Sequence, residues 1–183
     1  QVINTLARLH DADVVATAIT KYSGTREITT DSVNATTYRL QEVGRGNGIE
    51  TYDLQGGTTG TGVDFLDTDN YWNNVNPQQD EVATDAHFAA EMTYDYYWLE
   101  HGRNSIDNNG FKLISRVHYD VGYVNAFWDG TQMTYGDGNG APYTPLTSLD
   151  IGGHEITHGL TENSANLVYS YESGALNESF SDV

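Results

Sequence analysis

The segment "GGHEITHGL", residues 152–160, places two histidines four positions apart. In a helix, positions i and i+4 lie on one face with their Cβ atoms roughly 6 Å apart, so His154 and His158 would point toward a single ion. Glu155 would lie beside that ion without ligating it. Imidazole nitrogens are good zinc ligands, and a carboxylate beside a zinc-bound water is a general base. The spacing therefore predicts a helix that carries a zinc site with a base next to it.

The residues before the first histidine favour a helix at this position. Thr147 or Ser148, in "PLTS", is a suitable N-cap. Gly152 and Gly153 lack side chains and allow another backbone or a substrate to approach closely. The two histidines are therefore expected on one face of a capped helix.

A third ligand follows in "GALNESFSD". Zinc in a hydrolase takes three protein ligands and leaves one position for water, and Glu178 completes that set. Asp182, one turn later, is placed to accept the second N–H of a ligating imidazole. The alternative for Glu178 is a helix-start carboxylate that interacts with the helix dipole.

A longer helical pattern covers residues 76–102, and strand patterns surround it. Asn76 is the expected cap, Pro77 fits the first helical position, and Gly102 ends the pattern. His87 has no partner at ligand spacing and is interpreted as a packed histidine. Residues 1–65 and 111–138 alternate polar with β-branched or aromatic residues between glycine-rich turns, which predicts strands. The apolar stripe of the helix is Val82, Ala86, Ala89, Ala90, Tyr94 and Tyr97.

Composition narrows the possible partners. The chain of 183 residues has 26 acidic and 8 basic residues, a net charge of −18, which argues against nucleic-acid binding. The acidity indicates either a solvated surface or carboxylates that hold Ca²⁺. There are no cysteines, so zinc ligands must be His, Asp or Glu. No apolar run is long enough to span a bilayer, and no membrane partner is expected.

Taken together, these segments resemble the thermolysin-like zinc metalloproteases, in order and spacing and over most of the chain. The N-terminal "QVINTLARLHDAD" matches less well. The matching pieces are "RGNGIETYD", "TDAHFAAEMTYDYYW", "VHYDVGYVNAFWDGTQMTYGDG", "HEITH" and "ESGALNESFSD".

The resemblance implies an α+β fold. Residues 1–146 would form a β-rich, antiparallel N-terminal domain with a long helix. Residues 147–183 would form the active-site helix and the truncated start of an α-helical C-terminal domain. The substrate cleft would lie between the two domains.

The resemblance also implies roles at the metal. The motif histidines and Glu178 would bind Zn²⁺, Glu155 would take a proton from the zinc-bound water, and Tyr169 would stabilise the oxyanion.

Substrate and calcium residues follow from the same resemblance. "NAFW" would be an edge strand that pairs with extended substrate, with Asn125 and Ala126 making the polar contacts. Tyr143 and Ile151 would line the pocket for the residue after the cut, which implies cleavage before bulky hydrophobic residues. Asp150 matches a calcium ligand of the family.

A lateral calcium site is the weaker part of the resemblance. Asp67 and Asp69 match its first ligands, but Tyr71 stands at the next ligand position.

The function implied is that of a secreted, extracellular zinc endopeptidase acting on peptide and protein substrates. The family's downstream catalytic histidine and arginine lie beyond Val183, so residues 1–183 alone are expected to be weakly active or inactive without the C-terminal domain. Two alternative functions fit the sequence less well. A non-catalytic, zinc-stabilised binding module has no need for Glu155. An aminopeptidase needs an acidic motif that grips a free amine, and none precedes the "HEITH" helix.

Overall fold

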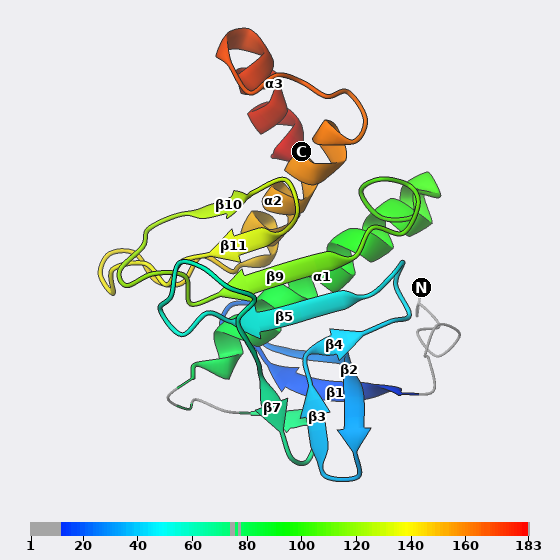
Figure 1. The fold of residues 1–183 in the computed structure, drawn as a ribbon, viewed down its shortest axis with the longest axis vertical. Helices are drawn as coiled ribbons and strands as arrows, with labels where there is room; N and C mark the ends of the chain where they lie inside the picture. The colour runs from blue at the N-terminus through cyan, green and yellow to red at the C-terminus, as the bar shows by residue number, and fades with distance from the viewer. Residues whose placement is uncertain (1–11, 74–75, 77, 183) are drawn as a thin grey trace.

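The computed structural model describes residues 12–73, 76 and 78–182, which form two β-sheets and three α-helices (Figure 1). The predicted α+β class is confirmed. Among the described residues, no helix is long and apolar enough to cross a membrane.

The N-terminal strands form sheet A, in the order β7-β3-β2-β1-β8. Its longest pairing is the antiparallel ladder between β1 and β2, in which Val15 lies opposite Thr29. The strands are β1 (Asp13–Ile19), β2 (Thr25–Asn34), β3 (Thr37–Arg39), β7 (Leu66–Asp67) and β8 (Tyr71–Trp72).

Sheet B has the order β10-β11-β9-β5-β4, and β6 (Val63–Asp64) pairs with β5 outside this path. In β5 and β9 alternate residues are buried, as the period of two in a half-buried strand requires. The strands are β4 (Gln41–Glu42), β5 (Ile49–Asp53), β9 (Leu113–Val117), β10 (Ala126–Trp128) and β11 (Met133–Tyr135).

The expected antiparallel pairing does not hold throughout, because β1 pairs with β8 in parallel in sheet A and sheet B also contains parallel pairs. β5 pairs with β9 in parallel, and so does β11. The chain between β5 and β9 contains a long helix, and such a crossover returns the chain in the same direction. Only the pairs β10 with β11, β4 with β5 and β5 with β6 are antiparallel among the described strands of this sheet.

That crossover helix is α1 (Asp80–His101). It begins later than predicted, because the chain makes a separate turn first, in which the Gln79 N–H donates to the Asn76 carbonyl at 3.0 Å. Asn76 therefore closes this turn, and Gln79, at φ 54°, is the N-cap. Pro77 lies outside the described residues. Gly102, at φ 62°, ends the helix as predicted.

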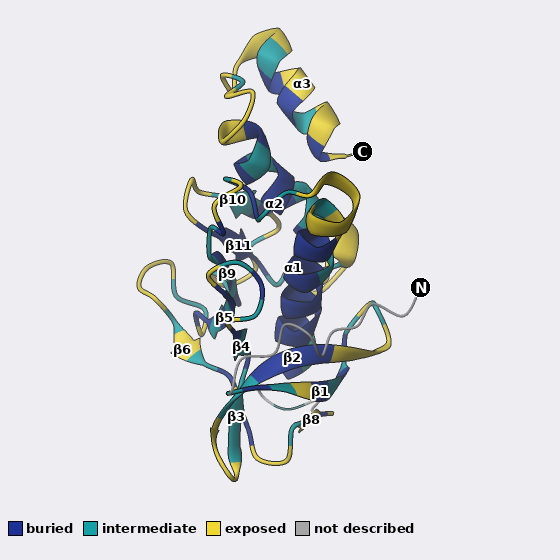
Figure 2. Cartoon of the chain, turned by 90° about the vertical axis from the view of Figure 1, so that its right-hand side faces the viewer, coloured by how far each residue is buried: buried dark blue, intermediate teal, exposed yellow. Residues whose placement is uncertain are grey.

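Helix α1 lies at the centre of the molecule and packs against both sheets. Figure 2 shows it buried along most of its length. The predicted apolar stripe is confirmed, with Tyr97 only half-buried. His87 is fully buried, as expected of a packed histidine.

Two further helices follow the sheets. α2 (Leu149–Glu162) crosses α1, and α3 (Tyr171–Ser181) packs on α2. The α1–α2 contact places α2, with its histidines, beside β10, the terminal strand of sheet B among the described strands.

Candidate metal centre and active site

Helix α2 brings the two motif histidines together, as the four-residue spacing predicted. Ser148 is the N-cap residue, and its hydroxyl contacts the Asp150 carboxylate. The Nε2 atoms of His154 and His158 lie 2.9 Å apart. Both imidazoles therefore present a ring nitrogen to one point.

Hydrogen bonds on the far side of each ring determine which nitrogen carries the proton. His154 Nδ1 lies 2.8 Å from Asp182 Oδ1, and His158 Nδ1 lies 2.7 Å from Asn177 Oδ1. A carboxylate and an amide oxygen accept hydrogen bonds, so both Nδ1 atoms carry the hydrogen. Both Nε2 lone pairs then face each other.

Glu178 adds a carboxylate to the same point. Its Oε2 lies 3.1 Å from His154 Nε2, and its Oε1 lies 3.7 Å from His158 Nε2. One ligand atom from each of the three residues lies within 4.8 Å of the others, the only such group of three among the described residues. Converging lone pairs repel unless a cation lies between them. Two nitrogens and one oxygen are the donors that catalytic zinc takes, so the residues fit this ion.

Glu178 was expected near the start of its helix, but it lies in the last turns of α3. The helix-dipole alternative is therefore wrong, because that interaction requires the first turn.

Glu155 lies beside this group without joining it. The residue is 7% exposed, and its Oε2 accepts a hydrogen bond of 3.0 Å from the Trp128 backbone N–H. Burial raises the pKa of Glu155, and the nearby histidines oppose this rise. A buried carboxyl held in one orientation beside a metal centre suits a general base.

A cavity of about 680 Å³ opens next to Glu155, between α1, α2 and β10. Ile151, which was predicted to line a pocket, lines this cavity together with Asn125 and Ala126. The contacts of Asn125 and Ala126 with substrate stay a prediction. Tyr143 is 54% exposed and is not among the lining residues of this cavity. Leu146 lines it instead and is half-buried.

A second cavity of about 610 Å³ is lined by residues of β10, α2 and α3, and it reaches His154, His158 and Glu178. Tyr169 lines it, 67% exposed, and its hydroxyl donates to Glu178 Oε1. Tyr169 therefore lies next to Glu178, and its role on the oxyanion stays a prediction.

The comparison with protein families decides the ancestry of this site. The profile of the thermolysin metallopeptidase catalytic domain matches residues 15–162, which include both histidines and Glu155. The chain belongs to the thermolysin metallopeptidase family.

Individual proteins of the thermolysin family are also similar to this chain in sequence. Bacillolysin of Brevibacillus brevis is 51% identical over 148 residues, which cover 80% of this chain and 27% of that protein. A transglutaminase-activating metalloprotease of Streptomyces mobaraensis is 47% identical over 170 residues, 91% of this chain and 22% of that protein. The chain thus spans about a quarter of the length of these relatives.

A solved thermolysin-family structure supports the fold. The precursor of protealysin, a metalloproteinase from Serratia proteamaculans, superimposes with a TM-score of 0.64 at 37% identity. The match covers 73% of this chain and 40% of that one.

The calcium candidates of this thermolysin-family chain do not form a cluster of three with other acidic or histidine side chains in the described part. Asp67 Oδ1 accepts from the backbone N–H groups of Asp69 and Asn70, and Asp69 Oδ1 accepts from Tyr71 N–H. These carboxylates thus cap their own loop. Asp150 is exposed and lines the larger cavity. Calcium binding stays a prediction.

Three residues of the site were not predicted from the sequence. Asn177 orients His158, the Trp128 N–H orients Glu155, and Leu146 lines the cavity. Asn177 lies next to Glu178, and Leu146 lies just before the α2 cap, so their neighbours hinted at them. The role of Trp128 could not be predicted from a pattern of side chains, because the donor is its backbone N–H.

Close packing of α2 on α1 positions the whole site. A Cβ built on Gly152 would lie 2.5 Å from the Ala89 Cβ, so this crossing requires glycine. A Cβ on Gly153 would meet its nearest neighbour, Thr93 Oγ1, at 3.7 Å, which is an ordinary contact.

Gly152→Ala should therefore destabilise the full-length protein by about 1–3 kcal/mol, the usual cost of overpacking. Gly153→Ala is the matched control, and it should be neutral or stabilise by up to about 1 kcal/mol, because alanine favours a helix over glycine. Urea unfolding of both variants checks this. Equal stability of the two would mean that the helices separate at little cost.

Proposed function

We propose that the protein is a secreted zinc endopeptidase that cleaves peptide bonds before bulky hydrophobic residues. One observation carries the proposal: one ligand atom from each of His154, His158 and Glu178 lies within 4.8 Å of the others, beside the buried Glu155. Membership of the thermolysin family supports the zinc and the protease class. Secretion rests on the family resemblance alone.

His154, His158 and Glu178 would hold the zinc. Zinc in such a site lowers the pKa of a water molecule and polarises a carbonyl group. Asp182 and Asn177 keep the hydrogens of the two rings on Nδ1, which leaves each Nε2 free to ligate.

Glu155 would act first as a general base and then as a general acid. Its carboxylate accepts a proton from the attacking water as the water oxygen bonds to the peptide carbonyl carbon. It then delivers that proton to the amide nitrogen as the C–N bond breaks. The hydrogen bond from Trp128 N–H fixes the carboxyl orientation for both transfers. Tyr169 would donate to the oxyanion.

Strand β10 would bind the substrate backbone. It is the terminal strand of sheet B in the described chain, and Asn125 and Ala126 line the cavity beside it. An extended peptide can therefore add to its edge by main-chain hydrogen bonds. Leu146 and Ile151 give the cavity an apolar wall, which favours a bulky hydrophobic residue after the cut. We keep Tyr143 as a further contact of that residue.

The alternative of a non-catalytic zinc module finds no support in this arrangement. A structural zinc site closes its fourth position with a protein ligand. Here Glu155 does not belong to the group of three ligand atoms, and its carboxyl accepts a hydrogen bond from Trp128 N–H. We propose calcium ions as additional stabilising ligands of the full-length protein.

The test compares the full-length protein with residues 1–183. The full-length protein should contain zinc and cleave a peptide with leucine after the scissile bond faster than one with glycine there. Removing the metal with a chelator should abolish cleavage, and zinc should restore it.

Residues 1–183 alone should cleave far more slowly. Val168, Leu176 and Phe180 are apolar and at least half exposed on α3 or just before it. The family's downstream oxyanion donors would also be absent, and each such donor contributes about 10²–10³ in rate. Zinc-independent cleavage by the full-length protein would contradict the proposed function.

A further inference from the structure

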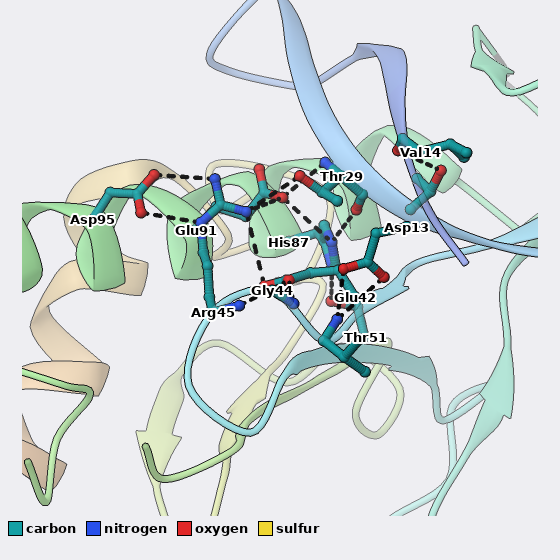
Figure 3. Close-up of polar contacts among 12 residues, drawn as sticks. Asp13, Val14, Thr29, Glu42, Gly44, Arg45, Thr51, His87, Glu91 and Asp95 are labelled. Atoms are coloured by element: carbon teal, nitrogen blue, oxygen red, sulfur yellow. Dashed lines mark hydrogen bonds and ion pairs between the residues drawn. The ribbon is translucent and has the colours of Figure 1, made fainter. Parts of the chain in front are cut away.

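A buried group of charged side chains joins the N-terminal strands to helix α1, on a different face of α1 from the one that contacts α2 (Figure 3). The group comes from β1, β4, the loop after β4, and α1. None of its side chains belongs to a residue more than 6% exposed. We call it the carboxylate latch, and its members are Asp13, Glu42, Arg45, Glu91 and Asp95.

The latch has one arginine for four carboxyl groups. Arg45 Nε and Nη2 donate to the two oxygens of Asp95 at 3.1 and 3.0 Å. Its Nη1 donates to Glu91 Oε1 at 3.0 Å. Glu42 Oε1 lies farther away, 3.8 Å from Nη1. The guanidinium therefore interacts more closely with Asp95 and Glu91 than with Glu42.

Two carboxyl oxygens in the latch are buried without a hydrogen-bond partner among the described residues: Glu42 Oε1 and Glu91 Oε2. The other oxygen of Glu42 accepts from the N–H groups of Gly44 and Arg45 at 2.6 and 3.0 Å. An ionised carboxylate that is buried with a bare oxygen is costly. A proton on that oxygen removes the charge.

His87 does not supply a second positive charge. Its Nε2 lies 2.9 Å from the Thr29 carbonyl, so Nε2 carries the hydrogen, and Nδ1 accepts from the Thr51 hydroxyl at 2.9 Å. Burial lowers the pKa of His87 to about 4, so the ring is neutral at pH 7. Its Nε2 lies 3.9 Å from Glu91 Oε1.

Carboxylates of the latch also accept hydrogen bonds from backbone N–H groups of neighbouring segments. Glu91 Oε1 on α1 accepts from the Thr29 N–H on β2 at 2.8 Å. The Asp13 carboxylate on β1 accepts from the Val43 N–H, just after β4, at 3.0 and 3.2 Å. Charge repulsion inside the latch would therefore strain the contact between sheet A and α1.

We propose that the carboxylate latch holds a proton in the folded protein at neutral pH, and that loss of this proton loosens sheet A from α1. Protonation leaves fewer negative charges around Arg45 and gives a bare oxygen a hydrogen. Deprotonation places additional negative charge where water cannot solvate it. The latch is thus a pH-sensitive element away from the metal centre.

The pKa values agree with this arrangement. Burial raises the pKa of Glu42 from 4.5 to about 8, with Arg45 opposing the rise and Glu91 adding to it. Burial likewise raises the pKa of Glu91 to about 7. Between the ordinary and the raised values, the folded chain binds a proton that the unfolded chain does not. The stabilisation is complete below pH 4.5 and is lost as the pH rises toward 8.

Glu42→Gln in the full-length protein tests the latch, because glutamine keeps the shape of a protonated glutamate and cannot ionise. Urea unfolding is measured from pH 5 to pH 9, with Glu155→Gln in every protein to prevent self-digestion. In the protein with an intact latch, the unfolding equilibrium constant should rise by up to about tenfold per pH unit for each bound proton. Glu42→Gln and Glu91→Gln should each flatten this rise.

Glu27→Gln is the matched control, because Glu27 is exposed on β2, next to the same helix–sheet contact. It should keep the full pH dependence. Equal slopes for Glu42→Gln, Glu91→Gln and Glu27→Gln would overturn the proposal.

A second measurement needs no folded variant. Difference infrared spectra of the protein with an intact latch, labelled with ¹³C-glutamate, should show a protonated carboxyl at pH 6 that disappears by pH 9. Amide exchange at Thr29 and Gly44 should become faster over the same range than the intrinsic pH effect explains. Absence of the protonated carboxyl at pH 6 would overturn the proposal even if Glu42→Gln failed to fold.

Discussion

Replacing Glu155 by glutamine should lower peptide cleavage by the full-length protein by about 10²–10⁴-fold, the usual contribution of a general base, while zinc stays bound. We propose Glu155 as a neighbour of the zinc ligands and not as a ligand, and glutamine can still accept the hydrogen bond from Trp128 N–H. What disappears is the group that takes the proton. The measurement is kcat/KM on a short peptide, together with zinc content determined on the same sample.

Glu27→Gln serves as the control for charge removal, since Glu27 is exposed on β2, far along the chain from the metal group. It should retain full turnover. If Glu155→Gln kept near-normal turnover with zinc bound, another group would have to act as the base.

His154→Ala should remove zinc and cleavage together. The substitution deletes one of the three ligand atoms and leaves His158 and Glu178 with an incomplete site. Zinc content after dialysis should fall to background, and added zinc should not restore cleavage at concentrations that saturate the unaltered protein. His101→Ala, at the exposed end of α1, is the matched control and should retain zinc.

Asp182→Asn should weaken zinc binding less than His154→Ala does. Asp182 accepts the Nδ1–H of His154 and does not ligate. Its loss should weaken zinc binding by about 10–100-fold, measured by competition with a chromogenic chelator. A metal affinity unchanged by both His154→Ala and Asp182→Asn would place the zinc elsewhere.

Sequence patterns predicted the parts of this site that depend on helical spacing. The four-residue interval between His154 and His158 requires only a helix, and α2 confirms it. The end of α1 was equally readable, because Gly102 adopts the left-handed conformation that stops a helix. The start of α1 was not, because Asn76 can close a turn or cap a helix with the same side chain.

Long-range pairing was beyond reach of the sequence. Arg45 falls within residues 1–65, for which the sequence predicts only strands and glycine-rich turns, and its partners Glu91 and Asp95 lie 46 and 50 residues away. The parallel pairing of β5 with β9 has the same origin, since strand direction depends on the path of the intervening helix. The acidic composition likewise gave no hint that three carboxyl groups gather around one buried guanidinium.

Strand β10 has a consequence for which proteins can be digested. It is three residues long, and among the described strands it ends its sheet, so a substrate would be held there through its main chain. Main-chain hydrogen bonds are the same for nearly every amino acid, so this edge is indifferent to side chains. In a folded protein, however, the backbone groups of strands and helices are already paired. The edge would therefore discriminate by conformation, accepting segments that have left their fold and sparing those that have not.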